Sequence, residues 1–281
     1  MQADLTTWLP DELWVKILGY CDVENETHSA LSRLNKRIYN LVSWSIRTLC
    51  VTLPATHDYP PDLLTSLVRR YPHLQRMSLG PSRAENSTLT PFERYRLYFE
   101  NFISALRTDP TFLQGVTEFS YSELGGDSEF HAELFQAIAH LNLKSFEIKA
   151  SCRFSSSIGG AEIQSLAVNS WSLKRVAFVG GGSCSPNMKK VDFSQFTALQ
   201  ELHLMRWRGD IAVLESLPFC EKLTMLVLEY LGVEGDKVVE VLCQREWKLT
   251  HLELMGLSLG YEQIEQLKER APQLVFFHVN K

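Results

Sequence analysis

Apolar residues recur along this chain in one short pattern: an apolar residue, two variable residues, a second apolar residue, one variable residue and a third apolar residue. The alternation at the end of the pattern is typical of a β-strand with one buried face. The pattern is found eight times, with its apolar residues at Leu74-Met77-Leu79, Val116-Phe119-Tyr121, Leu143-Phe146-Ile148, Leu173-Val176-Phe178, Leu199-Leu202-Leu204, Leu223-Leu226-Leu228, Leu249-Leu252-Leu254 and Leu274-Phe277-Val279.

The spacing of these patterns indicates a structural repeat. In the C-terminal half the first apolar residue lies at positions 173, 199, 223, 249 and 274, so the intervals are 26, 24, 26 and 25 residues. The earlier intervals are 42, 27 and 30 residues, and the longest contains the polar insertion 81–91 followed by a predicted helix from Pro91 to Leu106. A period of about 20–29 residues is characteristic of leucine-rich repeats.

Between the strand patterns, apolar residues follow a helical spacing, so each unit predicts a strand, a loop and a helix. The groups are Leu64, Leu67 and Val68; Leu134, Phe135 and Ile138; Ile211, Leu214 and Leu217; Val238, Val239 and Leu242; and Ile264 and Leu267. Residues 62–281 therefore resemble a leucine-rich-repeat domain. The resemblance implies an α/β solenoid, with a curved parallel sheet and outer helices. An ordinary α/β domain with similar-looking strands is the alternative.

One feature departs from the leucine-rich-repeat pattern. That family usually has Asn or Cys three residues after the last apolar strand position, where the side chain satisfies backbone groups of the turn. In this chain the corresponding positions hold Trp207, Leu231 and Leu257. We therefore expect turns that are less regular than those of the family.

The N-terminal residues 5–53 do not follow the repeat. Pro10 can begin a helix, because proline is favoured at the first helical position. Two helices with apolar faces are predicted, from Leu9, Leu13 and Ile17 and from Leu31, Leu34, Ile38 and Leu41. Residues 54–61 form a proline-containing linker. A helical unit of this size rarely has a sufficient core of its own, so it must contact the repeats, a partner or both.

The strings LPDELWVKILGYCD and SALSRLNKRIYNLV resemble an F-box. The matching positions are Leu9, Pro10, Glu12, Leu13, Ile17, Leu18, Asp22, Leu31, Leu34, Lys36, Arg37, Ile38 and Leu41, whereas Cys21 stands where Leu is usual. The stretch from Ser45 to Val51 is similar to the short strand that leads into the repeats of F-box proteins.

The F-box resemblance implies a function. F-box segments dock on a Skp-type adaptor, and through it on a cullin, in a ubiquitin ligase whose repeats hold a protein substrate. The adaptor-binding residues would be Leu9, Pro10, Leu13, Trp14, Ile17, Leu18, Leu31, Leu34 and Ile38. The alternative is a repeat scaffold whose N-terminal helices only cap the solenoid, as terminal units of such arrays must.

Composition narrows the classes of partner. The 281 residues carry a formal net charge of -5, so the chain lacks the basic field that nonspecific nucleic-acid binding requires. No apolar run is long enough to span a bilayer, and the first residues contain no secretory h-region, so we expect no membrane partner and a location in the cytoplasm or nucleus. The six cysteines are scattered without metal-ligand spacing.

No catalytic motif is found, so we expect a non-catalytic binding protein without cofactor or metal. Gly180-Gly181-Gly182 lacks the Lys and Ser/Thr of a phosphate-binding loop, and His203, His251 and His278 are expected on a solvated surface. Variable strand positions should point away from the core and line the concave face. The candidate substrate-binding residues are Arg175, Glu201, His203, Arg206, Trp207, Met225, Glu229, Glu253, Met255 and His278, on a face that also includes Arg76, Glu118, Ser120, Glu147 and Lys149.

Overall fold

The strand patterns of the sequence form one sheet. The computed structural model describes residues 46–53, 62–81, 91–109, 111–122, 128–149, 158, 160–169, 171–180, 191–206 and 211–280. The sheet contains β1 (Thr48–Leu53), β2 (Arg76–Pro81), β3 (Glu118–Ser122), β4 (Ser145–Lys149), β5 (Arg175–Val179), β6 (Glu201–Met205), β7 (Met225–Glu229), β8 (His251–Met255) and β9 (Phe276–Asn280). The eight predicted patterns correspond to β2 through β9, and the predicted strand before them is β1.

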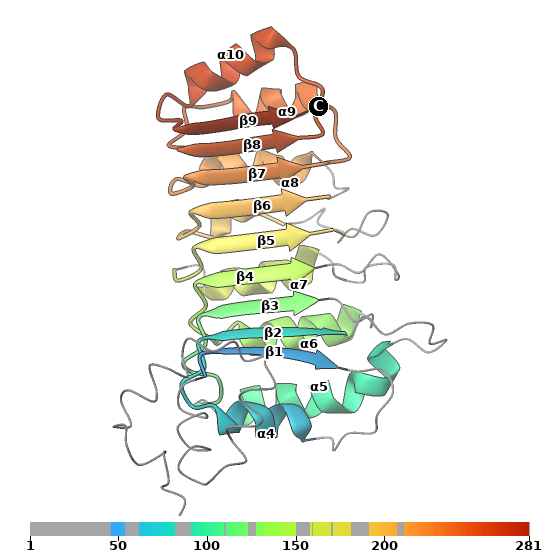
Figure 1. Cartoon of the computed structure of the whole chain (residues 1–281). Coiled ribbons are helices and arrows are strands. Elements are labelled where there is room, and N and C mark those ends of the chain that lie inside the picture. Colours follow the sequence, from blue (N-terminus) through green and yellow to red (C-terminus); the bar gives the residue numbers. More distant parts are fainter. Residues whose placement is uncertain are drawn as a thin grey trace, which may run out of the picture.

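All nine strands are parallel, and their order in the sheet is their order in the sequence. The register does not slip between units. Phe146 of β4, for example, aligns with Val176 of β5, and Val176 aligns with Leu202 of β6. Figure 1 shows the strands stacked along the length of the molecule. The chain is an α/β leucine-rich-repeat solenoid, as the sequence predicted.

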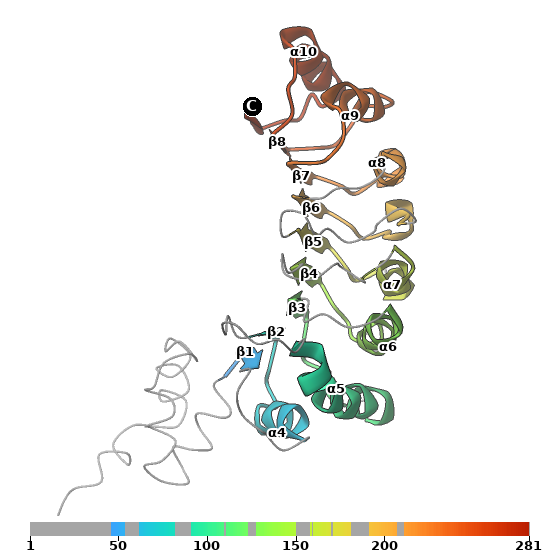
Figure 2. The same cartoon turned by 90° about the vertical axis from the view of Figure 1, so that its right-hand side faces the viewer.

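Helices connect the strands and cover one face of the sheet, and no helix of the described residues covers the other face, which we call the open face (Figure 2). The helices are α4 (Leu63–Arg70), α5 (Pro91–Thr108), α6 (Ser128–Ile138), α7 (Gly160–Ser165), α8 (Ala212–Glu215), α9 (Gly235–Leu242) and α10 (Tyr261–Arg270), with 3-10 turns at Leu166–Asn169, Phe193–Gln195 and Leu217–Phe219. The apolar groups predicted as helical lie on α4, α6, α8 with its following turn, α9 and α10. The helix predicted from Pro91 to Leu106 is α5. Helix α7 was not predicted.

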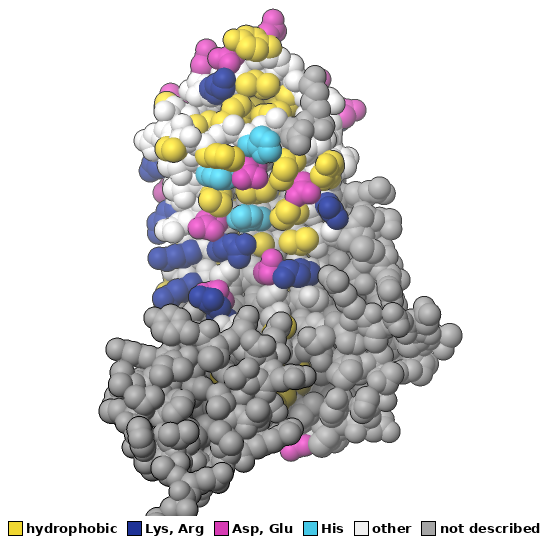
Figure 3. Space-filling view, viewed as in Figure 1, with side chains coloured by type: hydrophobic (Ala, Val, Ile, Leu, Met, Phe, Trp, Pro, Cys, Tyr) yellow, Lys and Arg dark blue, Asp and Glu magenta, His cyan; other side chains and the backbone are white. Residues whose placement is uncertain are grey.

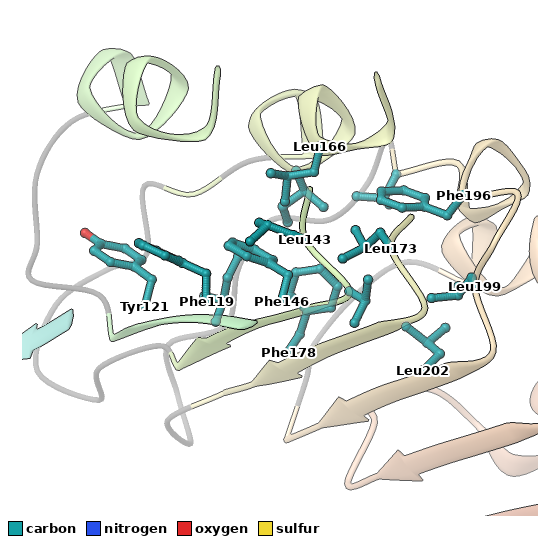
Figure 4. Packing of buried hydrophobic residues seen from close by; sticks show 14 of the residues in the cluster. Phe119, Tyr121, Leu143, Phe146, Leu166, Leu173, Phe178, Phe196, Leu199 and Leu202 are labelled. Atoms are coloured by element: carbon teal, nitrogen blue, oxygen red, sulfur yellow. The ribbon is translucent and has the colours of Figure 1, made fainter. Parts of the chain in front are cut away.

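The hydrophobic core lies between the sheet and the helices, and its composition changes along the solenoid (Figure 4). Around β3 and β4 the core is aromatic: the rings of Phe119 and Phe146 are stacked at 6.3 Å, and the edge of Phe135 meets Phe146 at 5.6 Å. From β6 to β8 the inward positions are leucines with at most 1% of their surface exposed: Leu202, Leu204, Leu226, Leu228, Leu252 and Leu254. Stacking of neighbouring units buries the apolar side chains that a single unit would leave exposed to solvent.

Strands β6, β7 and β8 are followed by the same backbone conformation, which corrects the expectation of irregular turns for the described turns after β7 and β8. The residue directly after each strand has a left-handed backbone: Arg206 at φ 51°, Tyr230 at φ 48° and Gly256 at φ 70°. The backbone N–H of Arg206 donates to the carbonyl of Glu229 at 2.6 Å. Leu231 and Leu257 are buried, so in these turns apolar contact replaces the usual polar side chain.

Strand β1 belongs to the repeat sheet. Ile46, Leu49 and Val51 are buried, and Leu49 aligns with Met77 of β2. Residues 46–53 of the predicted N-terminal segment are therefore structurally continuous with the solenoid. The remainder of that segment, with the nine adaptor-binding candidates from Leu9 to Ile38, lies outside the described residues, as do the linker 54–61 and Trp207.

Candidate protein-binding face

The open face of the sheet presents three rows of side chains that run across the strands. Alternate residues of each strand point to this face, and the register aligns each of them with the equivalent residue of the next strand. The first row is Arg76, Glu118, Ser145, Arg175, Glu201, Met225, His251 and Phe276; the second is Ser78, Ser120, Glu147, Ala177, His203, Val227, Glu253 and His278; and the third is Ser122, Lys149, Val179, Met205, Glu229 and Met255.

The structure brings nine of the ten candidate substrate-binding residues to this face. Arg175, Glu201 and Met225 lie in the first row, His203, Glu253 and His278 in the second, and Glu229 and Met255 in the third, while Arg206 directly follows β6. The tenth, Trp207, is outside the described residues. This placement supports the predicted register and leaves the binding role of each residue as a prediction.

On strands β2 to β5 the face is dominated by ion pairs. Arg76 Nε lies 3.1 Å from Glu118 Oε1, across neighbouring strands, and Lys149 Nζ lies 3.0 Å from Glu147 Oε2, on the same strand. The Ser120 hydroxyl also donates to Glu147 at 3.0 Å. Figure 3 shows the open face in space-filling form where grey residues do not cover it, with basic and acidic side chains in the lower part of the visible area. Exposed pairs of this kind contribute little to stability, because water screens them in both states.

On strands β7 to β9 the same face is aromatic and apolar around Glu253, while the second carboxylate, Glu229, is buried in the third row. His251 Nε2 lies 2.7 Å from Glu253 Oε1, and the His251 ring is stacked on Phe276 at 4.3 Å with an interplanar angle of 11°. The edge of His278 meets Phe276 at 6.2 Å. Figure 3 shows histidine, acidic and apolar side chains gathered over this part of the sheet.

Sequence analysis missed several members of this cluster. Phe276 was not a candidate, although its side chain is 44% exposed in the first row. His251 was noticed only as one of three strand histidines. The position of both residues in the strand pattern could have identified them. Phe276 and His251 directly precede the middle apolar residue of their pattern, as the candidate Met225 does.

Glu229 lies on the open face, as the strand alternation predicts, but it is buried there. The residue is 8% exposed. Met205 and Met255 flank it in the third row, and its carboxylate Oε1 lies 3.6 Å from Nε of Arg206. Ala177 and Val227 of the second row are also buried.

His203 is half-buried beside these residues. Burial is the main cause that lowers the pKa of its imidazole below the usual range, and the nearby Arg175 lowers it further. Its Nε2 atom is buried and has no hydrogen-bond partner among the described residues. His203 is therefore neutral at physiological pH and adds no charge to the centre of the face.

Other candidate sites give less support for a function. A cavity of about 540 Å³ is lined by the end of α4 and the loop before β3, including Arg69, Asp109 and Phe112. In its lining the Thr111 hydroxyl donates to Asp109 Oδ1 at 2.6 Å, in an exposed turn. Among the described residues, no group of three or more His, Cys, Asp and Glu can hold a metal ion. Burial raises the pKa of the Cys220 thiol to about 12, which makes it a poor nucleophile. None of the described helices is long and apolar enough to cross a membrane.

No protein-family model matches the chain, and no curated protein matches its sequence. Solved structures with a similar fold share little sequence with it. A crystal structure of a TLR13–ssRNA13 complex has a TM-score of 0.37 and 14% identity, and the similarity covers 76% of this chain but 23% of that one. The Rad7 and Elc1 complex in yeast gives 0.47 and 15%, with 96% of this chain and 61% of that one covered.

The leucine-rich-repeat-containing protein LegL7 from Legionella pneumophila has a TM-score of 0.40 and 13% identity, covering 92% of this chain and 89% of that chain. The present chain thus spans less than two thirds of the TLR13 and Rad7–Elc1 chains. These similarities concern the fold alone.

Proposed function

We propose that this chain is a non-catalytic protein-interaction scaffold that holds a target protein on the open face of its sheet. The observation that carries the proposal is the face itself, where nine parallel strands present three aligned rows of side chains. Over β7 to β9 these rows combine exposed aromatic, apolar and acidic groups. Buried or half-exposed aromatic side chains are frequent at the energetic centres of protein interfaces.

We further propose that the chain is the substrate-recognition subunit of a Skp–cullin–F-box ubiquitin ligase. The support for this step is the F-box resemblance of residues 5–53. In this proposal the N-terminal helices bind a Skp-type adaptor, and the sheet holds a target near the ubiquitin-transfer subunits. Tethering raises the effective concentration of the target at the transfer site without any catalytic group in this chain.

A quantitative adaptor pull-down tests the ubiquitin-ligase proposal. Replacing Leu9 and Pro10 by Ala should remove apolar contact with the adaptor. A loss of about 2 kcal/mol corresponds to about thirtyfold weaker binding. The matched control is His278→Ala, on the open face, which should leave adaptor recovery unchanged. Equal recovery of adaptor by wild type and the Leu9/Pro10 variant would contradict the proposal.

The alternative role, a scaffold with N-terminal helices that cap the solenoid, is favoured by one observation. Among the described strands, β1 pairs with β2 only, so its other edge needs cover. A deletion distinguishes the two roles, and it must end at residue 45, because Ile46, Leu49 and Val51 are core residues. A sharp fall in Tm on removal of residues 1–45 would favour a cap. A nearly unchanged Tm together with lost adaptor binding would favour the ligase subunit.

A further inference from the structure

One part of the open face differs from the rest and has a definite chemical preference. We call it the C-terminal patch and define it by six outward side chains of β7 to β9: Met225, His251, Phe276, Glu253, His278 and Met255. It lies in the upper part of the face in Figure 3. Its members are apolar or aromatic side chains around one carboxylate, that of Glu253. This arrangement defines which side chains a bound segment needs at each position.

Glu253 differs from the other carboxylates of the face in its partner. Glu118, Glu147, Glu201 and Glu229 each lie within 3.6 Å of an arginine or lysine nitrogen. Glu253 instead has His251 Nε2 at 2.7 Å. The partner of Glu253 is thus an imidazole, whereas the other four carboxylates have an arginine or lysine side chain.

Among the described residues, Glu253 therefore has no arginine or lysine partner, and it is partly desolvated, since 23% of its side chain is exposed. A cation that approached from solvent would find an acceptor whose charge is not already balanced by a fixed base. Charge-assisted hydrogen bonds of this kind are stronger than neutral ones, and complementarity of this kind gives interfaces their specificity.

The spacing of the rows fixes the shape of a matching ligand. His251, Glu253 and Met255 are alternate residues of β8, so they lie about 6.6–6.8 Å apart along the strand. An extended peptide has the same distance between alternate side chains. A peptide that lies along β8 thus places its side chains i, i+2 and i+4 over the first, second and third rows.

The first-row position of such a peptide meets apolar and aromatic surface, and the third-row position meets Met255, which has the buried Glu229 beside it. In the first row Met225 and Phe276 lie on either side of His251, and the Phe276 ring is stacked on the imidazole at 4.3 Å. In the third row Met255 follows Glu253 on the same strand. Methionine side chains adapt to different apolar groups, so they accept more than one aliphatic residue.

We propose that the C-terminal patch binds an extended segment of the target protein with the pattern apolar–x–Lys/Arg–x–apolar, in which the basic side chain pairs with Glu253. This inference rests on the proposed target-binding role of the face and names the class of target segment. It excludes acidic and phosphorylated segments as ligands of this patch, because Glu253 repels them.

Fluorescence anisotropy with three defined probes tests the inference. The full chain is titrated with fluorescein-labelled peptides GSLSKSLSG, GSLSESLSG and GSASKSASG. The lysine peptide should bind about tenfold more tightly than the glutamate peptide, which is the ratio that about 1.4 kcal/mol of charge pairing provides. The alanine peptide should also bind more weakly, because it lacks the outer apolar contacts. Equal binding of the lysine and glutamate peptides, or no binding of the lysine peptide at about 1 mM, would overturn the inference.

Variants connect the preference to the residues that carry it. Glu253→Gln should reduce the lysine-over-glutamate ratio to about one, whereas Glu118→Gln, on the ion-paired part of the face, should leave it unchanged. His251→Lys places a fixed base beside Glu253, as the other four carboxylates have, and should also abolish the ratio. His251→Gln keeps a neutral donor and should preserve it. A ratio that survives His251→Lys and Glu253→Gln would contradict the role of Glu253.

The failure of this inference is separable from that of the ligase proposal. All four variants are also measured in the adaptor pull-down, where each should behave like wild type. Absence of the peptide preference in the wild-type chain, with intact adaptor binding, refutes the inference alone. Intact peptide preference without adaptor binding refutes the ligase role alone, and leaves a scaffold with a defined peptide specificity.

Discussion

The two halves of the open face use the same backbone for different chemistry. On β2 to β5 the outward positions form exposed ion pairs, such as Arg76 with Glu118. On β7 to β9 they form the C-terminal patch, with Phe276 stacked on His251. The inward residues, not the outward ones, hold the strands in register, so the outward positions are free to vary. The hydrophobic core also differs between the two halves: aromatic residues lie beneath the first half of the face, and leucines lie beneath the second half.

The largest effect should come from breaking the core beneath the first half. Phe146 is fully buried and contacts the rings of Phe119 and Phe135. Phe146→Ala should lower the free energy of unfolding by about 3–5 kcal/mol, through lost burial and the cavity it leaves. The measurement is urea unfolding followed by circular dichroism.

The comparison with the second half uses Leu226, which occupies the equivalent inward position in β7. Leu226→Ala should cost about 2–5 kcal/mol by the same mechanism. A loss of less than about 1 kcal/mol for Phe146→Ala would mean that the aromatic cluster does not hold the first half together.

A smaller effect is expected in the turn after β8. Gly256 has φ 70°, and a Cβ atom at this position would lie 2.4 Å from Cδ1 of Tyr230. Gly256→Ala should therefore cost about 1–2 kcal/mol in left-handed backbone strain alone, and more from the clash. The same urea measurement on Tyr230→Ala and on the double variant completes a mutant cycle. The Gly256→Ala substitution should be less harmful when the Tyr230 ring is absent; equal costs in both backgrounds would exclude the contact.

The ion pairs of the two halves should differ modestly in strength. Arg206–Glu229 has a carboxylate side chain that is 10% exposed, whereas both side chains of Arg76–Glu118 are at least 47% exposed. Double-mutant cycles with Ala should give a coupling energy of about 1 kcal/mol for the first pair and less than about 0.5 kcal/mol for the second. The reverse order would show that partial burial of Glu229 does not strengthen its pairing.

The smallest effect concerns pH. Burial lowers the pKa of His203 in the folded chain, so the unfolded chain binds the proton first as the pH falls. Stability should therefore be fully present above about pH 6.5 and decrease as the pH is lowered below it. Urea midpoints at about pH 7.5 and pH 5 should diverge less in His203→Gln than in wild type. An unchanged pH dependence in the variant would assign the loss to other groups.

Much of the fold was predictable because the inward strand positions obey a simple rule. Leu202, Leu226 and Leu252 recur at nearly constant spacing, and burial requires apolar residues there. Helix α7 escaped prediction because only Gly160 and Ile163 of its six residues are buried, which leaves no helical apolar pattern. The turns were mispredicted because buried leucines take the place of the usual polar side chain.

The binding face was predictable in position but not in detail. Strand alternation places Glu229 and Glu253 on the same side of the sheet, and both are there. Whether each is solvated depends on its neighbours across the sheet, which sequence spacing alone does not reveal. Glu229 is covered by methionines of two other strands, and the partner of Glu253 is a histidine rather than a lysine or arginine.

The identical order of strands in the sequence and in the sheet bears on how such a chain can change its length. Among the described strands, each one is hydrogen-bonded to the strands that precede and follow it in the chain and to no other. Duplication of one whole unit, for instance the segment from Met225 to Thr250, would leave every other pairing intact and lengthen the array. A gain or loss of units is thus a small step for this architecture, whereas the same change in the middle of an interleaved sheet would separate strands that must pair.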